Sequence, residues 1–232
     1  MFPIKDTIPS REPPIVTKLL IAVNTIIFLF QAILPKKILA GFIYDFALIP
    51  VQLSGNHMTL ITSTFLHGSW LHLLGNMWSL WLYGDNVEDA MGHFKFLVFY
   101  LLCGALSGYT RFLFNMQSKL PTIGASGAVA GVMGAYFLLY PHAKIITFVP
   151  TIFFFPLFIP IPAVIFLLFW FLSQVFSGTV NWFIGNMAGG VAWWGHIGGF
   201  ISGMLLQKVF TDRRYRRPKP RYPDWAKGRN RY

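Results

Sequence analysis

Four polar residues lie within apolar stretches of the chain: Ser126, His196, His72 and Asn76. Polar and ionisable side chains are rare inside apolar helices and usually mark a functional site. A serine hydroxyl becomes a nucleophile when a neighbouring base accepts its proton, and His196 is the candidate base. His72 and Asn76 are spaced i, i+4, so both lie on one helix face, where both can donate hydrogen bonds to an oxyanion. These residue types predict acyl transfer through a serine and a histidine.

Each of these residues also has a purely structural interpretation. Ser126 begins an apolar segment and is flanked by glycines, which is typical of a helix N-cap or of a small-residue contact. His72 and Asn76 are consistent with hydrogen bonds between neighbouring helices. A lone His196 is more often a hydrogen-bonded core residue. The catalytic interpretation therefore depends on finding all four together.

The composition predicts a membrane protein. Of the 232 residues, 55% are hydrophobic and only 12% are charged, whereas soluble domains carry about 25% charged residues. The net charge is +11, but ten of the nineteen Lys and Arg lie between Lys208 and Arg231. Such a basic tail is typical of contact with anionic lipid, and we expect no nucleic-acid partner.

Metal and disulfide chemistry are not expected. Cys103 is the single cysteine, so the chain has no intramolecular disulfide. His67 and His72 lack an accompanying His-Glu-x-x-His pattern or a carboxylate at ligand spacing. The sequence therefore calls for neither a metal nor another cofactor.

The apolar stretches predict an all-α, polytopic membrane protein with six transmembrane helices. A membrane-spanning helix needs roughly 20 apolar residues. Six segments qualify, at about 17–34, 68–84, 94–114, 124–140, 158–177 and 188–207. A five- or seven-helix count remains the alternative, because prolines interrupt 148–162, which we expect to lie in the interface or to enter the membrane as a kinked segment.

The expected organisation is a single membrane domain, 17–207, between two polar ends. Residues 1–16 form an N-terminal segment without a signal-peptide pattern, and 208–232 form the basic tail. With the N-terminus inside, fifteen Lys and Arg fall on the cytoplasmic side and four on the other. The positive-inside rule therefore predicts that both termini are cytoplasmic. We expect a plasma (inner) membrane, and the oligomeric state is left open.

The candidate residues share one depth in this topology. His72 lies thirteen residues from Asp85, Ser126 fifteen from Pro141, and His196 twelve from Lys208. At 1.5 Å per residue these separations are about 20, 22 and 18 Å from the cytoplasmic helix ends. The fourth helix is also short, about 24 Å against a hydrocarbon core of about 30 Å. Ser126 is therefore expected at the base of a water-accessible cavity in the outer third of the bilayer.

Two sets of glycines are expected to bring the helices of Ser126 and His196 together. Glycine recurs in the fourth and sixth segments at spacings that allow close backbone contact. The glycines are Gly124, Gly127, Gly131, Gly195, Gly199 and Gly203. No acidic residue completes a triad, so we expect this close packing to orient His196. Gly199→Leu is then expected to lower turnover without unfolding the protein.

Several motifs in this order make the chain similar to the rhomboid intramembrane serine proteases of bacterial type, which have a six-helix core. The motifs are Met1-Phe-Pro-Ile-Lys-Asp6, His67…His72-xxx-Asn76, Gly84-Asp-Asn-Val-Glu-Asp89, Gly124-Ala-Ser-Gly127 and Gly195-His-Ile-Gly-Gly199. The resemblance covers most of the chain.

The resemblance implies a role for each candidate residue. Ser126 is the nucleophile and His196 the base of a Ser-His dyad, while His72, Asn76 and the backbone amide of Ser126 form the oxyanion hole. The fifth helix and the loop 177–190 resemble the family's gate and cap. Family substrates are single-pass membrane proteins cut in or near their transmembrane helix. One departure is Ala130, where some members carry an aromatic residue that stacks on the histidine.

Two other classes of protein remain as alternatives. One is a catalytically silent, rhomboid-like protein that binds membrane clients, although such relatives usually lack the serine or the histidine. The other is a small transporter, a class for which discontinuous helices in two related halves would be the expected signature.

Overall fold

The computed structural model describes residues 2–149, 157–183 and 192–212. Nearly all of the basic tail, Pro150 and Pro156 of the proline-rich stretch, and the end of the expected cap loop lie outside the described residues. The elements are β1 (Phe2–Asp6), α1 (Ile15–Ile33), α2 (Lys36–Phe46), η1 (Pro50–Gly55), α3 (Thr59–Thr62), η2 (Ser63–Phe65), α4 (Trp70–Met91), α5 (His93–Phe114), α6 (Ser126–Leu139), β2 (Lys144–Val149), β3 (Leu157–Pro162), α7 (Ala163–Phe183) and α8 (Trp193–Phe210).

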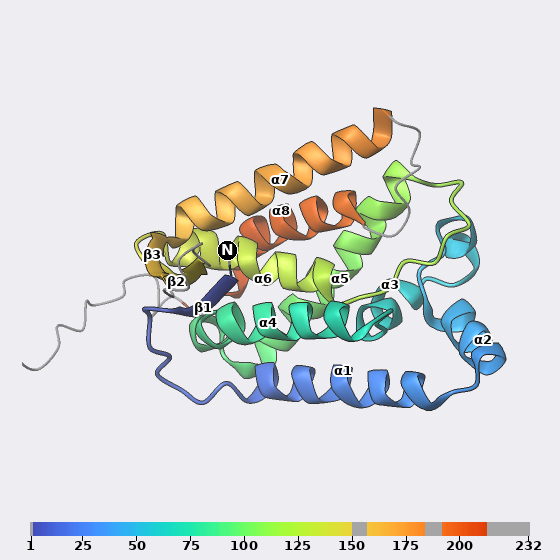
Figure 1. The fold of residues 1–232 in the computed structure, drawn as a ribbon, viewed down its shortest axis with the longest axis horizontal. Helices are drawn as coiled ribbons and strands as arrows, with labels where there is room; N and C mark the ends of the chain where they lie inside the picture. The colour runs from blue at the N-terminus through green and yellow to red at the C-terminus, as the bar shows by residue number, and fades with distance from the viewer. Residues whose placement is uncertain (1, 150–156, 184–191, 213–232) are drawn as a thin grey trace, which may run out of the picture.

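The long helices form a bundle around α6. Figure 1 shows α1 and α4 on one side of α6, with α8 and then α7 on the other, and these neighbours are in contact. In α6, ten of its fourteen residues are buried, whereas only five of the twenty-one residues of α7 are buried. The helix that begins at Ser126 is thus the centre of the molecule, and α7 lies at its edge.

The outer faces of the bundle are apolar. On α7 the exposed side chains Phe169, Leu172 and Phe176 recur at helical spacing. On α1 the buried polar residues recur every seven residues on the inner face; they are Thr17, Asn24 and Gln31. Apolar side chains outside and polar ones inside reverse the pattern of a soluble helix. This arrangement fits a protein surrounded by lipid.

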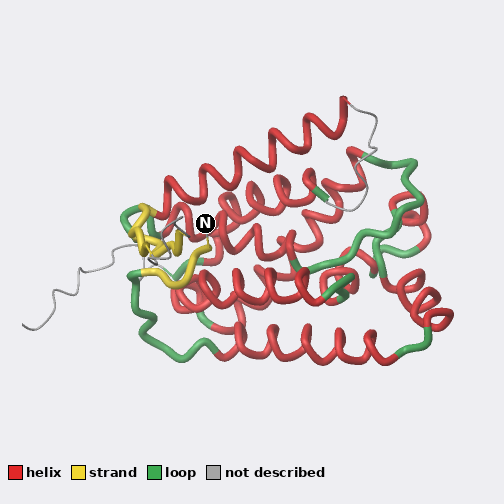
Figure 2. The backbone as a smooth tube through the Cα atoms, in the orientation of Figure 1, coloured by secondary structure: helices red, strands yellow, loops and turns green. Residues whose placement is uncertain are grey.

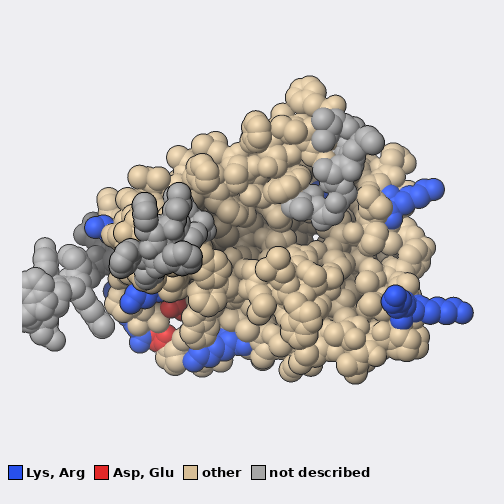
Figure 3. Space-filling view, viewed as in Figure 1, with Lys and Arg blue, Asp and Glu red and all other residues tan. Residues whose placement is uncertain are grey.

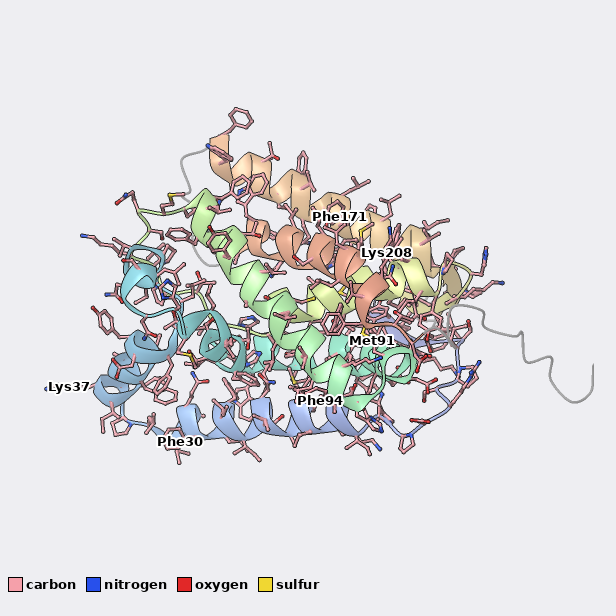
Figure 4. All side chains as sticks on the ribbon, turned by 180° about the vertical axis from the view of Figure 1, so that it is seen from behind. Phe30, Lys37, Met91, Phe94, Phe171 and Lys208 are labelled. Atoms are coloured by element: carbon pink, nitrogen blue, oxygen red, sulfur yellow. The ribbon has the colours of Figure 1, made fainter. Side chains whose placement is uncertain are left out.

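Charged side chains gather toward the two ends of the bundle, as the space-filling view shows for one face (Figure 3). From the opposite side, Lys37 lies at the α2 end, Lys208 lies toward the end that holds the strands, and Phe30 of α1 points away from the bundle (Figure 4). By length and composition, α1, α5 and α7 can cross a membrane. This is a multi-pass membrane protein, and the expectation of six spans stays a prediction.

The fold is mostly helical, as expected, but not entirely so, because three antiparallel strands gather at one end of the bundle (Figure 2). Strand β2 lies between β1 and β3, with Phe2 opposite Phe148 and Lys144 opposite Pro162. The second half of the proline-rich stretch is thus strand β3, not a kinked membrane segment. Proline is tolerated there because β3 is an edge strand.

The acidic segment that begins at Gly84 belongs to helix α4, which continues to Met91. Glu88 is 1% exposed and accepts hydrogen bonds from the backbone N–H groups of Val16 and Thr17, at 2.8 and 2.7 Å. Those are otherwise unsatisfied donors at the start of α1. The carboxylate therefore caps one helix from the side of another and fixes α1 against α4.

The segment between α1 and α4 is folded into the molecule. In this segment Thr59, Ser63 and Thr64 are buried. A Cβ atom added at Gly104 of α5 would lie 2.8 Å from the Thr64 side chain, so this segment packs closely on α5. It forms the wall of the bundle that faces the start of α6.

Asp6 joins β1 to the helices. Its carboxylate accepts hydrogen bonds from the Tyr136 hydroxyl and, at 2.9 Å, from the Asn86 side chain. Burial raises the pKa of Asp6 to about 6, an effect that the hydrogen bond from Tyr136 opposes and the charge of Asp85 reinforces.

This raised pKa predicts a pH-dependent stability. Between the ordinary pKa of about 3.8 and the folded value of about 6 the folded state binds more protons, so the contribution of Asp6 is present below pH 4 and is lost as pH rises through 6. Asp6→Asn, which stays neutral, should lack this loss when thermal unfolding in detergent is followed from pH 4 to 7.5. The exposed Asp45→Asn is the control, and a wild-type curve parallel to that of Asp6→Asn would contradict the prediction.

Candidate active site

Ser126 and His196 are in direct contact. Nε2 of His196 lies 2.8 Å from Oγ of Ser126, and Nδ1 lies 2.8 Å from Oε1 of Gln174 on α7. An amide oxygen only accepts hydrogen bonds, so Nδ1 carries the ring proton and donates it to Gln174. Nε2 is then the acceptor, and the Ser126 hydroxyl donates to it. A neutral imidazole in this tautomer is the form that can take a proton from the serine.

Ser126 is placed by the loop before α6. Gly124 donates its N–H to the Ser63 carbonyl at 2.9 Å, and Leu48 and Thr122 exchange two backbone hydrogen bonds. Gly124 has φ +126°, and a Cβ atom there would lie 2.6 Å from the His72 ring. Both observations require glycine at this position. The turn therefore brings the first residue of α6 beside the start of α4.

His196 is placed by backbone contact between α6 and α8. A Cβ atom at Gly199 would lie 2.1 Å from the Gly127 carbonyl oxygen, and one at Gly203 would lie 1.9 Å from that of Gly131. No side chain could fit there without displacing a backbone. Gly127 directly follows Ser126, and Gly199 lies one helical turn after His196, so this contact sets the distance between the two functional side chains.

The remaining predicted glycines contact a third helix. A Cβ atom at Gly127 would lie 1.9 Å from Oγ of Ser107 on α5, and one at Gly131 would lie 2.4 Å from the Cys103 side chain. A Cβ atom at Gly195 would lie 3.2 Å from the same Oγ of Ser107. Small side chains of α5 thus fill the groove between α6 and α8.

His72 and Asn76 face the same cavity from α4. The Asn76 side chain is 8% exposed, and its Nδ2 lies 3.0 Å from Nε2 of His67. An amide nitrogen has two hydrogens, so one remains for the cavity. His67 is in turn held by Gln31 of α1, which donates to its carbonyl at 3.3 Å and accepts from its N–H at 3.1 Å.

Ser126 and His196 line a cavity of about 340 Å³. His72, Asn76, Ser126 and His196 all line it. The N–H groups of the first turn of α6 have no partner within the helix and carry its partial positive charge. The cavity therefore combines a nucleophile, a base and several hydrogen-bond donors, which is the set that acyl transfer needs.

Sequence analysis missed two residues at this site, Gln174 and Arg111. Gln174 is a polar residue in an otherwise apolar span, and that was the signal available for it. Arg111 lines the cavity from α5 and carries the one full charge among the described residues that line it, but it entered the sequence argument only through the charge count. Gln31, which holds His67, was also overlooked.

The family is decided by comparison with known proteins. A model of the rhomboid domain matches residues 54–213, more than half of the chain. This chain belongs to the rhomboid family. The resemblance inferred from its motifs is therefore confirmed.

The chain is similar to rhomboid proteins of eukaryotes. It is 29% identical over 213 residues to the mitochondrial Rhomboid protein 1 of Saccharomyces cerevisiae, an alignment that covers 85% of this chain and 55% of that protein. It is 30% identical over 94 residues to the human mitochondrial presenilin-associated rhomboid-like protein, covering 39% and 25%. It is 35% identical over 81 residues to RHOMBOID-like protein 5 of Arabidopsis thaliana, covering 35% and 26%. The chain thus spans about half of the yeast relative and about a quarter of the other two.

The glycine contact of this rhomboid predicts a severe effect of a single methyl group. Gly199→Ala places a Cβ atom against the Gly127 carbonyl, which is backbone and cannot turn aside, so α6 and α8 must separate. We expect a loss of about 1–3 kcal/mol in stability together with lower turnover, measured by unfolding in detergent and by proteolysis. This revises the expectation that a larger residue at position 199 would spare the fold.

Gly41→Ala is the matched control. It lies inside α2, where an added Cβ meets nothing within 4 Å. Alanine there should be neutral or slightly stabilising. Equal effects of the two substitutions would refute the role given to the α6–α8 contact.

Proposed function

We propose that this rhomboid-family protein is an intramembrane serine endopeptidase that cleaves transmembrane segments of single-pass membrane proteins. The observation that carries the proposal is the 2.8 Å contact between Ser126 Oγ and His196 Nε2; the 2.8 Å contact of Nδ1 with the Gln174 amide oxygen supports placing the ring proton on the far nitrogen. A serine that only capped α6 would not need a histidine in its base-competent tautomer. The cavity beside the pair gives a scissile peptide a place to bind.

The reaction assigns one role to each group. Ser126 Oγ attacks the scissile carbonyl carbon while its proton moves to Nε2 of His196. The oxyanion that forms accepts hydrogen bonds from Asn76, His72 and the Ser126 N–H. When the tetrahedral intermediate collapses, the C–N bond breaks and the leaving amine takes the proton from His196. A water molecule, activated by the same histidine, then hydrolyses the acyl-enzyme.

The short α6 supports placement of this chemistry below a membrane surface. Its fourteen residues span about 21 Å, less than a hydrocarbon core of about 30 Å. We propose six membrane spans (α1, α4, α5, α6, α7 and α8), with residues 17–207 as the membrane domain, flanked by the segment 1–16 and the tail 208–232. Water then enters the cavity from the side on which α6 begins.

The charge distribution supports an orientation with both termini on one side. The strands carry Lys5 and Lys144 at the end of the bundle toward which Lys208 lies, whereas Lys36 and Lys37 begin α2 at the other end. We propose that the strand end is cytoplasmic. Two of the relatives described above are named as mitochondrial proteins, so the plasma membrane stays a prediction from the sequence.

The function is tested with a fluorophosphonate probe and a model transmembrane substrate. Wild-type protein should form an adduct on Ser126, seen by intact mass, and should cleave the substrate. Ser126→Ala and His196→Ala should do neither while unfolding at an unchanged temperature. Ser79→Ala, which alters a serine outside the cavity whose hydroxyl donates to the Gly75 carbonyl of its own helix, is the control and should stay active. A folded wild type that neither labels nor cleaves would favour the silent client-binding protein.

The substrate should need a segment that unwinds. A helical peptide carbonyl is hydrogen-bonded and shielded, so attack requires local loss of helix near the scissile bond. Glycine and proline weaken a helix, and replacing such residues near the cut with leucine should abolish cleavage of the model substrate. The control is a leucine substitution in the same substrate helix, at the same distance from the scissile bond but on the opposite face of the helix. Cleavage that is indifferent to both changes would contradict this mechanism.

A further inference from the structure

We propose that Gln174 is the positioning residue that holds His196 in its base-competent tautomer, taking the part that an acid plays in a catalytic triad. The inference rests on the function proposed above and concerns how its base is oriented. Sequence analysis assigned this task to helix packing alone. The hydrogen bond from Nδ1 of His196 to Oε1 of Gln174 offers a specific alternative.

The orientation of the Gln174 amide is fixed by its other end. Its Nε2 donates to Oγ of Ser173 at 3.1 Å and to the Trp170 carbonyl at 3.4 Å. The Ser173 hydroxyl itself donates to the Trp170 carbonyl at 2.6 Å, so its oxygen is free to accept from Gln174. An amide flip would break both Nε2 contacts and would turn two hydrogens toward the imidazole. The side chain therefore presents an oxygen to His196.

That oxygen decides which ring nitrogen carries the proton. With an acceptor at Nδ1, the neutral imidazole keeps its proton there and leaves the lone pair of Nε2 toward Ser126. Without the acceptor, the other tautomer becomes accessible, and its Nε2–H group cannot take a proton from the serine. In serine proteases the wrong tautomer is the main consequence of losing the acidic residue.

A second support for the ring comes from the same helix. Trp170 lies one turn before Gln174, and its ring centroid is 6.1 Å from that of His196. Position 130 of α6 supplies only the methyl group of an alanine, although it is buried in the core. Trp170 and Gln174 of α7 therefore both contact the His196 ring. Gln174 itself is 7% exposed, on a helix that buries few of its residues.

Two substitutions separate hydrogen bonding from packing. Gln174→Met keeps a side chain of similar length but removes the oxygen, whereas Gln174→Glu keeps an oxygen acceptor whether its carboxyl group is ionised or protonated. Thr179→Val is the control on α7, because the Thr179 hydroxyl bonds to the Val175 carbonyl of its own helix. The variants are compared for kcat, KM and the rate of fluorophosphonate labelling. Nitrogen NMR of labelled histidine reports the tautomer of His196.

The proposal predicts that Gln174→Met lowers kcat and the labelling rate together by about 10- to 100-fold, the loss typical of removing a partner that orients a histidine. KM should change little. The nitrogen signals should shift from a protonated Nδ1 to a mixture of tautomers. Gln174→Glu should recover most of the labelling rate, and Thr179→Val should match the wild type.

Two results would overturn the inference. One is a Gln174→Met protein that labels and cleaves at the wild-type rate while the wild type is active, which leaves the proposed function intact. The other is a wild type whose His196 carries its proton on Nε2. If Gln174→Met fails to fold, the wild-type tautomer and the activity of Gln174→Glu decide the question. Failure of the wild type to label would instead count against the proposed function, and the NMR result would still test the role of Gln174.

Discussion

The direct backbone contact between α6 and α8 is the constraint on which the site depends. Lipid tails are as apolar as leucine, so helices in a membrane associate through close packing and hydrogen bonds instead of hydrophobic burial. The carbonyl groups of Gly127 and Gly131 occupy the space where side chains at Gly199 and Gly203 would be. Because Ser126 precedes one of these contacts and His196 lies a turn before another, the distance between the two side chains follows from how closely the two helices meet.

Neutral amides, and not carboxylates, hold the functional side chains in place. Gln31 holds His67, His67 contacts Asn76, and Gln174 contacts His196. An ionised carboxylate within the bilayer is expensive, whereas an amide supplies a directed donor or acceptor without a charge to desolvate. The buried carboxylate of Glu88 lies instead at the strand end of the bundle, where it caps α1. The amides and the buried carboxylate of Glu88 are thus separated along the length of the bundle.

The sequence was sufficient for features that depend on local periodicity. Apolar length located all six long helices and placed the majority of their ends to within a few residues. The glycine spacings also anticipated the contact between α6 and α8 that brings Ser126 to His196. It was insufficient where partners are distant or composition misleads. Strand β1 pairs with β2 more than 130 residues away, and the acidic residue Glu88 finds its partners at the start of α1, more than 70 residues away. Gln174 was detectable as a polar residue in an apolar span, but its partner depends on how α7 packs.

In the proposed mechanism, Ser126 attacks a carbonyl carbon whose oxygen turns toward α4. A structure of the protein with a peptidyl phosphonate bound covalently would test this geometry. We expect a bond from Ser126 Oγ to phosphorus, with a phosphoryl oxygen within hydrogen-bond distance of the Asn76 and His72 side chains and the peptide in the cavity. An adduct on another residue, or an oxygen that turns away from Asn76 toward α7, would contradict it.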